Sequence, residues 1–177
     1  IYLLSTGSLS LTGSHYQEPF GGGNKFLPSV DLEGAVKLYN FIHKEISKGT
    51  IHSAHDLSEG GLAIALAESI IGGDLGAEIE LSSLVESYPD LADTIKLDYV
   101  LFAEGPSSIL VSIPGENQES WLAATKNAGK SFKTIYLGKV SPSNELKIHY
   151  NNSPVAALKI EELEKAHCNP LPMESEH

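Results

Sequence analysis

The sequence contains no arginine, and this absence limits the ligands that the protein can hold. All 12 basic residues are lysines and stand against 23 acidic residues, so the formal net charge is -11. A nucleic-acid partner demands a concentrated basic surface, so we expect none. Without the bidentate guanidinium fork, a bound phosphate must rely on backbone N–H groups, lysine or a metal.

Cysteine and long apolar runs are also scarce. Cys168 is the only cysteine, which excludes an internal disulfide framework and a thiolate zinc cage and fits a reducing cytoplasm. No apolar run approaches the roughly 20 residues of a membrane span, so we expect no membrane partner. The 177 residues, 41% hydrophobic and 20% charged, suit a single globular domain. The opening IYLL is typical of a strand, so we expect a piece of a longer protein.

The apolar patterning predicts an alternation of strands and helices. We expect strands over residues 1–4, 51–54, 77–81, 99–103, 108–113, 132–140 and 146–150. We expect helices over 31–48, 62–71, 119–128 and 160–167, with broken helical pieces between 84 and 97. Glycine and proline over 104–107 predict a hairpin. This order indicates an α+β fold in which a mixed sheet carries helices, with a long Gly/Ser-rich loop over 5–30 and a tail over 168–177.

The turn from His55 to Gly61 is the first candidate site. Helix N-termini present unpaired N–H groups, so a phosphate can dock there without arginine. Gly60 and Gly61 allow close backbone approach, and Asp56 at the strand end can ligate Mg²⁺. The alternative is local: Ser58 caps the helix and the glycines make a tight turn.

Other candidates are weaker. Thr12 to Tyr16 can line a ligand from the long loop, although a solvated loop explains them as well. Glu104 is either a ligand or general base, or a solvent-facing hairpin glutamate. Lys25 is a plausible phosphate contact or a surface lysine. His52 and His55 invite a metal-site hypothesis, but residues three apart on a strand face opposite sides, so we do not predict a transition metal.

Several segments resemble one family in the same order along the chain. The segment from His55 to Glu68, HDLSEGGLAIALAE, is similar to the motif HDxSDGGLxxALAE of the phosphoribosylformylglycinamidine synthase family, within the aminoimidazole ribonucleotide synthetase superfamily. Leu11–Tyr16 resembles the family's LGGSEY, and Pro28–Asp31 resembles its PxVD. Leu101–Glu104 resembles LFSE, and Leu158–Pro172 resembles the family's terminal leucine-rich helix with a final Leu-Pro. The resemblance is to the C-terminal domain and covers nearly the whole chain.

The resemblance implies a mixed, largely antiparallel sheet flanked by helices, partly ferredoxin-like. It implies an ATP-dependent carbon–nitrogen ligase of purine biosynthesis. In that reaction ATP phosphorylates the carbonyl oxygen of formylglycinamide ribonucleotide, and ammonia released from glutamine by a glutaminase partner displaces the phosphate. The ATP-binding sheet would lie largely in an N-terminal domain outside the chain, so the chain alone is expected to be inactive.

The resemblance also implies roles for particular residues. Asp56 matches the position whose carboxylate is expected to reach a nucleotide-bound magnesium. Positions near ligand phosphates or substrate are matched by Gly13, Ser14, Ser58, Gly60 and Gly61. No residue is assigned to catalysis.

Two departures from the family keep other hypotheses open. Ser107 and Ser108 stand where the family commonly has an arginine after LFSE, and TGSHY replaces GGSEY, with Thr12 and His15 at the changed positions. Two alternative identities of the chain therefore remain open. One is the C-terminal domain of a sibling enzyme of the selenophosphate synthetase or thiamine-phosphate kinase type, and the other is a non-catalytic module that holds a structural nucleotide.

Overall fold

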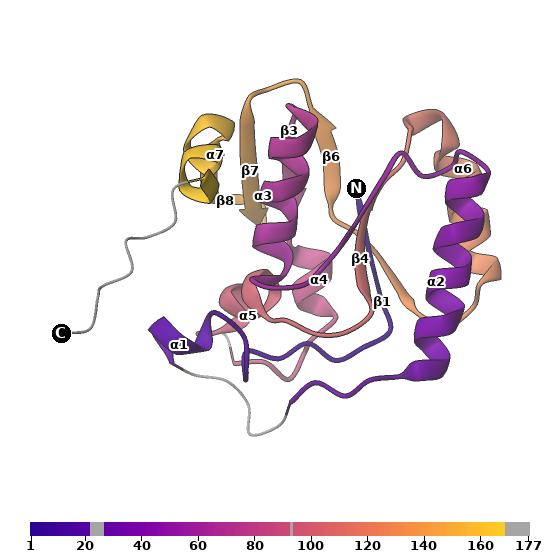
Figure 1. Cartoon of the computed structure of the whole chain (residues 1–177), viewed down its shortest axis with the longest axis horizontal. Helices are drawn as coiled ribbons and strands as arrows, with labels where there is room; N and C mark the ends of the chain where they lie inside the picture. Colours follow the sequence, from indigo (N-terminus) through magenta and orange to yellow (C-terminus); the bar gives the residue numbers. More distant parts are fainter. Residues whose placement is uncertain (22–26, 93, 169–177) are drawn as a thin grey trace.

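The fold is built from two four-stranded sheets, with helix α3 (Gly61–Gly73) between them (Figure 1). A computed structural model describes residues 1–21, 27–92 and 94–168. The first sheet is antiparallel throughout, and its strands in spatial order are β2 (Ser53–Asp56), β4 (Ser108–Ser112), β1 (Tyr2–Ser5) and β5 (Lys133–Tyr136). The second contains one parallel pair, β3 with β7, and its order is β6 (Gly138–Ser141), β3 (Gly76–Glu80), β7 (Glu145–Tyr150) and β8 (Ser153–Lys159).

Helices cover the faces of these sheets, as expected for an α+β fold. The remaining α-helices of the described part are α1 (Gln17–Phe20), α2 (Leu32–Ser47), α4 (Ser82–Glu86), α5 (Lys96–Phe102), α6 (Gln118–Asn127) and α7 (Ile160–Cys168). A 3-10 turn spans Gly115–Asn117. The predicted fold class is confirmed, with the strands divided between two sheets. Among the described residues, no helix combines the length and apolar character needed to cross a membrane.

Helix α3 supplies the centre of the larger hydrophobic core. Its sequence is apolar on nearly all sides, as a helix packed on several sides requires. Leu62, Leu66 and Ile70 are almost fully buried and pack with residues of both sheets. Helices α5 and α7 lie against α3 as well. The position of α3 is therefore set by its packing from several directions.

Helices α2 and α6 cover the other face of the first sheet (Figure 1). Helix α2 begins where predicted, because Asp31 accepts a hydrogen bond from the backbone N–H of Gly34 at 2.9 Å. Leu38 and Ile42 of α2 pack with Trp121 of α6 in a second, smaller cluster. Trp121 is fully buried at the centre of this cluster.

The predicted strand over 99–103 is wrong, because residues 99–102 belong to helix α5 and Ala103 is its C-cap. The run contains buried Tyr99, Val100 and Leu101, and a short continuous apolar run does not distinguish a buried strand from a buried helix. Helical hydrogen bonds run from the N–H of Tyr99 to the carbonyl of Ile95 and from the N–H of Ala103 to the carbonyl of Tyr99. The residues 104–107 accordingly connect a helix to β4 and do not form a hairpin.

The predicted strand over 132–140 divides into β5 and β6, which belong to different sheets. Between them Leu137 is fully buried and donates its N–H to the carbonyl of Ile1. Gly138 follows with φ of 150°, and a Cβ there would lie 1.9 Å from the carbonyl oxygen of Glu78. The close approach of two backbones at this glycine lets the chain pass from one sheet to the other.

Most other boundaries agree with prediction within a few residues. Strand β2 lies two residues later than predicted and includes His55 and Asp56, which were expected in the turn. Strand β8 was not predicted, since its Pro154 and exposed side chains are typical of an edge strand. The helix over 160–167 is confirmed as α7. Residues 169–177, with most of the predicted tail and the final Leu-Pro, lie outside the described residues, as does Lys25.

The hairpin between β7 and β8 is held by the Glu80 carboxylate. It accepts hydrogen bonds from the hydroxyl and backbone N–H of Ser82 and from the backbone N–H groups of Asn151 and Asn152. Both asparagines have positive φ, as in the two-residue loops that suit twisted hairpins. Desolvation acts to raise the pKa of Glu80, but the hydrogen bonds from Ser82, Asn152 and Asn151 outweigh it and hold that pKa below its ordinary value.

We expect Glu80→Gln to reduce the free energy of unfolding by about 1 kcal/mol at neutral pH. A folded-state pKa below the unfolded one contributes stability above the unfolded pKa, and this contribution is lost as pH falls through the folded pKa. The difference between wild type and variant should therefore shrink below about pH 4. Urea denaturation across pH 2.5–7 measures it, with Glu86→Gln on α4 as the control for loss of an exposed carboxylate. A difference that does not depend on pH would contradict this role of Glu80.

Candidate functional site

The turn between β2 and α3 requires both of its glycines. Gly60 precedes the helix in the left-handed conformation, with φ of 79°, and Gly61 follows with φ of 66°. A Cβ on Gly61 would lie 2.7 Å from the carbonyl oxygen of Ala103. The turn thus packs its backbone directly against the end of α5. The alternative in which Ser58 caps α3 through its side chain is wrong, because the N-cap residue is Gly60 and Ser58 contributes its carbonyl, which accepts the N–H of Gly61.

Glu104 connects this turn to the long loop. Its Oε1 atom accepts the backbone N–H of Gly60 at 2.8 Å and the backbone N–H of His15 at 2.9 Å. The Nδ1 atom of His15 lies 3.4 Å from the same oxygen. The side chain of Glu104 is only 20% exposed. Glu104 is therefore not the solvent-facing hairpin glutamate that we considered, and its carboxylate is the anion that meets the N-terminus of α3.

The predicted loop segment lies beside Glu104 and is joined to it by backbone hydrogen bonds. Ser10 and Glu104 form an antiparallel bridge, with N–H to carbonyl distances of 2.8 and 3.0 Å. Ser14 is buried, and its hydroxyl donates to the carbonyl of Leu11 at 2.8 Å. Gly13 has φ of 77° and donates its N–H to Oε1 of Gln17. Ser14 thus shapes the loop, whereas Gly13 is exposed at its surface.

Asp56 and His55 lie on opposite faces of the first sheet. Asp56 pairs with Ile109, whose side chain belongs to the cluster beneath α2, so successive residues of β2 alternate between this face and the α3 face. On the α3 face, Nε2 of His55 lies 3.1 Å from Oε2 of Glu68. Asp56 is exposed, and within the described ranges no hydrogen bond or ion pair joins its side chain to the turn at Gly60 and Gly61.

The side chains around Asp56 suit a magnesium ion that is held partly by a ligand, and they do not form a metal site made of protein groups alone. In the part of the chain that the structure describes, no group of three or more His, Cys, Asp and Glu residues is arranged to hold a metal. A closed, all-protein site at His52 or His55 is therefore not formed by these residues. Mg²⁺ commonly uses one or two carboxylates together with waters and substrate phosphates. The exposed carboxylate of Asp56 fits that arrangement.

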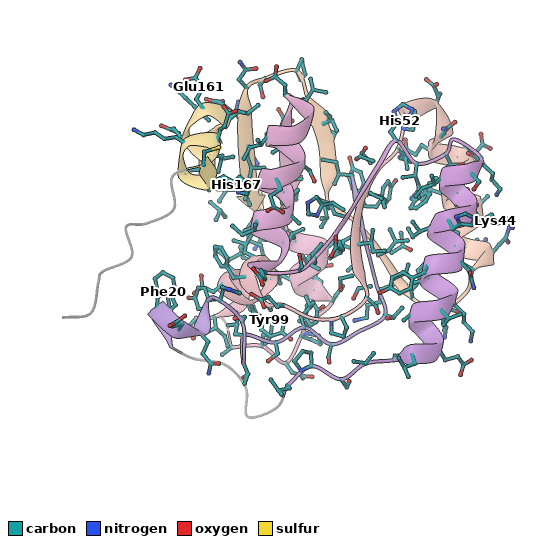
Figure 2. The ribbon with its side chains drawn as sticks, viewed as in Figure 1. Phe20, Lys44, His52, Tyr99, Glu161 and His167 are labelled. Atoms are coloured by element: carbon teal, nitrogen blue, oxygen red, sulfur yellow. The ribbon has the colours of Figure 1, made fainter. Side chains whose placement is uncertain are left out.

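A pocket of about 410 Å³ opens beside the turn. His15, Tyr16 and Phe20 line it from the loop and α1, Gly60 and Ile64 from the turn and α3, and Asp98 and Phe102 from α5. The hydroxyl of Tyr16 donates to Oδ2 of Asp98 at 2.8 Å, and its ring stacks on Phe102 with centroids 5.4 Å apart. Figure 2 labels Phe20 on α1, which lines the pocket, and Tyr99 on α5, which is buried and is not among the lining residues.

The pocket contains residues that were not predicted to belong to a site. Ile64 comes from α3, whose apolar sequence indicated core packing, and Asp98 and Phe102 come from α5, most of which was predicted to be a strand. No spacing signal could have found them, because they meet Tyr16 and Gly60 only through the tertiary fold. Of the predicted residues, Gly60 lines the pocket, Ser14 lies in the adjoining loop, and Ser58 and Asp56 lie at the surface before the helix.

We expect Gly61→Ala to lower the free energy of unfolding by roughly 2 kcal/mol or more, because it adds a Cβ in a left-handed conformation and against a carbonyl. Gly72→Ala, in the same helix, is the matched control. Gly72 has no atom within 4 Å of an added Cβ, so this change should be neutral or stabilise by about 0.5 kcal/mol. Chemical denaturation of both variants provides the measurement, and equal effects would show that the turn tolerates a side chain.

The chain matches the family described as AIR synthase related protein, C-terminal domain, over residues 2–151. It is 37% identical over 172 residues to the phosphoribosylformylglycinamidine synthase subunit PurL of Prochlorococcus marinus (strain MIT 9303), covering 93% of this chain and 20% of that protein. It is 41% identical over 172 residues to the subunit of the same name from Thermosynechococcus vestitus, covering 96% of this chain and 21% of that protein. The chain thus spans about a fifth of the length of these relatives.

Solved structures share the fold. T. maritima PurL complexed with FGAR superposes with a TM-score of 0.72 at 18% identity, covering 92% of this chain and 27% of that chain. The hydrogenase maturation protein HypE gives a TM-score of 0.55 at 16% identity, covering 89% of this chain and 51% of that chain. The arrangement of two sheets around α3 is therefore found in proteins of different names.

Proposed function

This chain belongs to the family of AIR synthase related C-terminal domains, and we propose that it is the single C-terminal domain, over residues 1–177, of a longer phosphoribosylformylglycinamidine synthase. The observation that carries the proposal is 37% identity over 93% of the chain to a subunit of that name. The fold alone does not choose among the siblings, since HypE shares it. The sequence identity favours the purine-pathway enzyme over them.

In the proposed reaction, the complete enzyme converts formylglycinamide ribonucleotide to the amidine. ATP phosphorylates the amide carbonyl oxygen, ammonia attacks that carbon, and phosphate leaves with the oxygen. The ammonia comes from glutamine by way of a glutaminase subunit or domain. Solved structures of T. maritima PurL in complexes with ATP and with FGAR support these ligands. We include a cytoplasmic location in the proposal, which a chain with one cysteine suits.

The residues of this chain would bind and orient the ligands, and they would not carry out the reaction without the rest of the enzyme. The turn with Gly60 and Gly61 reaches the pocket through Gly60, and the loop with Gly13 and Ser14 reaches it through His15 and Tyr16. A ligand phosphate in this region would meet backbone N–H groups, which need no arginine. The N–H groups of Gly60 and Gly61 already donate to Glu104 and to the carbonyl of Ser58, so a phosphate would use neighbouring groups such as the exposed hydroxyl of Ser58. Asp56 would hold Mg²⁺, which supplies charge neutralisation to the nucleotide phosphates when bound.

We expect Asp56→Asn, made in the full-length enzyme that carries this domain, to lower turnover by roughly tenfold or more, the scale on which altered metal-site residues act. It should also raise the magnesium concentration needed for half-maximal rate. Asp74→Asn, at the far end of α3, removes the same charge and should change neither quantity. Steady-state formation of the amidine from formylglycinamide ribonucleotide, ATP and ammonium provides the assay.

The two parts of the proposal fail in different ways. A full-length wild-type enzyme that does not convert formylglycinamide ribonucleotide would overturn the assigned reaction. An Asp56→Asn enzyme with normal turnover and normal magnesium dependence would overturn the role of Asp56 only. The 177-residue chain by itself should show no turnover, because the ATP-binding domain is expected outside it.

A further inference from the structure

One oxygen atom of Glu104 joins three segments that are far apart in sequence. Oε1 accepts the N–H of Gly60 in the turn and the N–H of His15 in the loop, while the backbone of Glu104 pairs with Ser10. Hydrogen bonds to an ionised carboxylate are stronger than those between neutral groups. Partial burial of the side chain, which is 20% exposed, reduces competition from water. The contact is therefore the kind that fixes the relative position of two backbones.

A second contact between the loop and the turn is weaker. Nε2 of His15 lies 3.9 Å from Oε2 of Glu59, and the two side chains are 64% and 82% exposed. Exposed ion pairs contribute little to stability. The hydrogen bonds of Ser14 to Leu11 and of Gly13 to Gln17 lie within residues 11–17 and shape the loop internally. Glu104 therefore carries the attachment of the loop to the N-terminus of α3 far more than the His15–Glu59 contact does.

The two residues that Glu104 holds both line the 410 Å³ pocket. His15 stands on the loop side and Gly60 on the helix side, so the shared acceptor sets the distance between two walls of the pocket. We infer that Glu104 is a positioning residue, which holds the loop over residues 10–16 and the turn over residues 57–61 in the arrangement that receives substrate. This inference rests on the proposed function, because it makes the pocket part of that enzyme's ligand-binding region.

The role requires an acceptor oxygen more than it requires a charge. A glutamine at this position keeps a carbonyl oxygen that can accept both N–H groups, although it loses the attraction of a carboxylate to the helix N-terminus. An alanine leaves both N–H groups without their acceptor. A residue that acted as a general base or metal ligand would lose its function in both variants. The comparison of the two substitutions therefore separates positioning from chemistry.

The experiment compares Glu104→Ala and Glu104→Gln in the full-length enzyme that carries this domain, with the exposed Glu116→Ala in the 3-10 turn as control. Glu104→Ala should raise KM for formylglycinamide ribonucleotide by roughly tenfold and change kcat much less. The reason is that the loop and the turn lose their fixed spacing on the two sides of the pocket, while the groups that take part in the reaction are unchanged. Glu104→Gln should restore KM to within about threefold of wild type. Hydrogen exchange should accelerate at the amides of Gly60 and His15 in Glu104→Ala and remain slow in Glu104→Gln.

Several results would overturn the inference. An unchanged KM in a folded Glu104→Ala enzyme would do so, and so would a Glu104→Gln enzyme as impaired as Glu104→Ala. A lower melting temperature with unchanged KM would assign Glu104 a purely structural role. If wild-type enzyme lacks the proposed turnover, the proposed function fails by itself, and amide exchange at Gly60 and His15 then decides whether Glu104 holds the two segments.

Discussion

The burial of helix α3 is the constraint on which the rest of the structure depends. Leu62, Leu66 and Ile70 place apolar surface toward both sheets and the neighbouring helices. The helix must therefore lie where these elements bury its apolar surface on several sides. Its N-terminus must then find acceptors for backbone N–H groups that have no partner within the helix. No side chain of the helix's own cap supplies one. The loop and the end of α5 meet at this point, and the acceptor comes from Glu104.

The surplus of carboxylates shapes how this protein orders its loops. Glu104 accepts N–H groups from Gly60 and His15, and Glu80 accepts N–H groups from Asn151 and Asn152. In both places a carboxylate joins backbone segments that are distant in sequence, and each replaces a contact that would otherwise be made with water. A chain with 23 acids and no arginine has such acceptors in abundance. No lysine is among the described residues that line the pocket, so the proposed phosphate recognition there would depend on backbone geometry and on metal.

The secondary structure could be predicted best where local chemistry is unambiguous. Asp31 as a cap and the helical spacing of apolar residues such as Ala35 and Ile42 predicted the helix that is α2, because these signals act within one helix. The run at Tyr99 was assigned to a strand because a short apolar segment satisfies either structure, and only packing against α3 decides between them. Strands β5 and β6 were predicted as one strand because nothing in the local sequence distinguishes Gly138 from an ordinary strand glycine. Only the tertiary structure places the backbone of Glu78 against it.

The sequence by itself determined the fold class, the buried helix α3 and the glycine turn before it, since these follow from periodicity and from the conformations open to glycine. It also identified the separate segments around Ser14, Gly60 and Glu104. Only the tertiary structure decided that Glu104 joins the other two, that His55 and Asp56 face opposite sides of a sheet, and that Asp98 and Phe102 complete the pocket. The reason is physical, because hydrogen bonds and pocket walls between distant segments depend on how whole elements pack, and no local pattern records that packing.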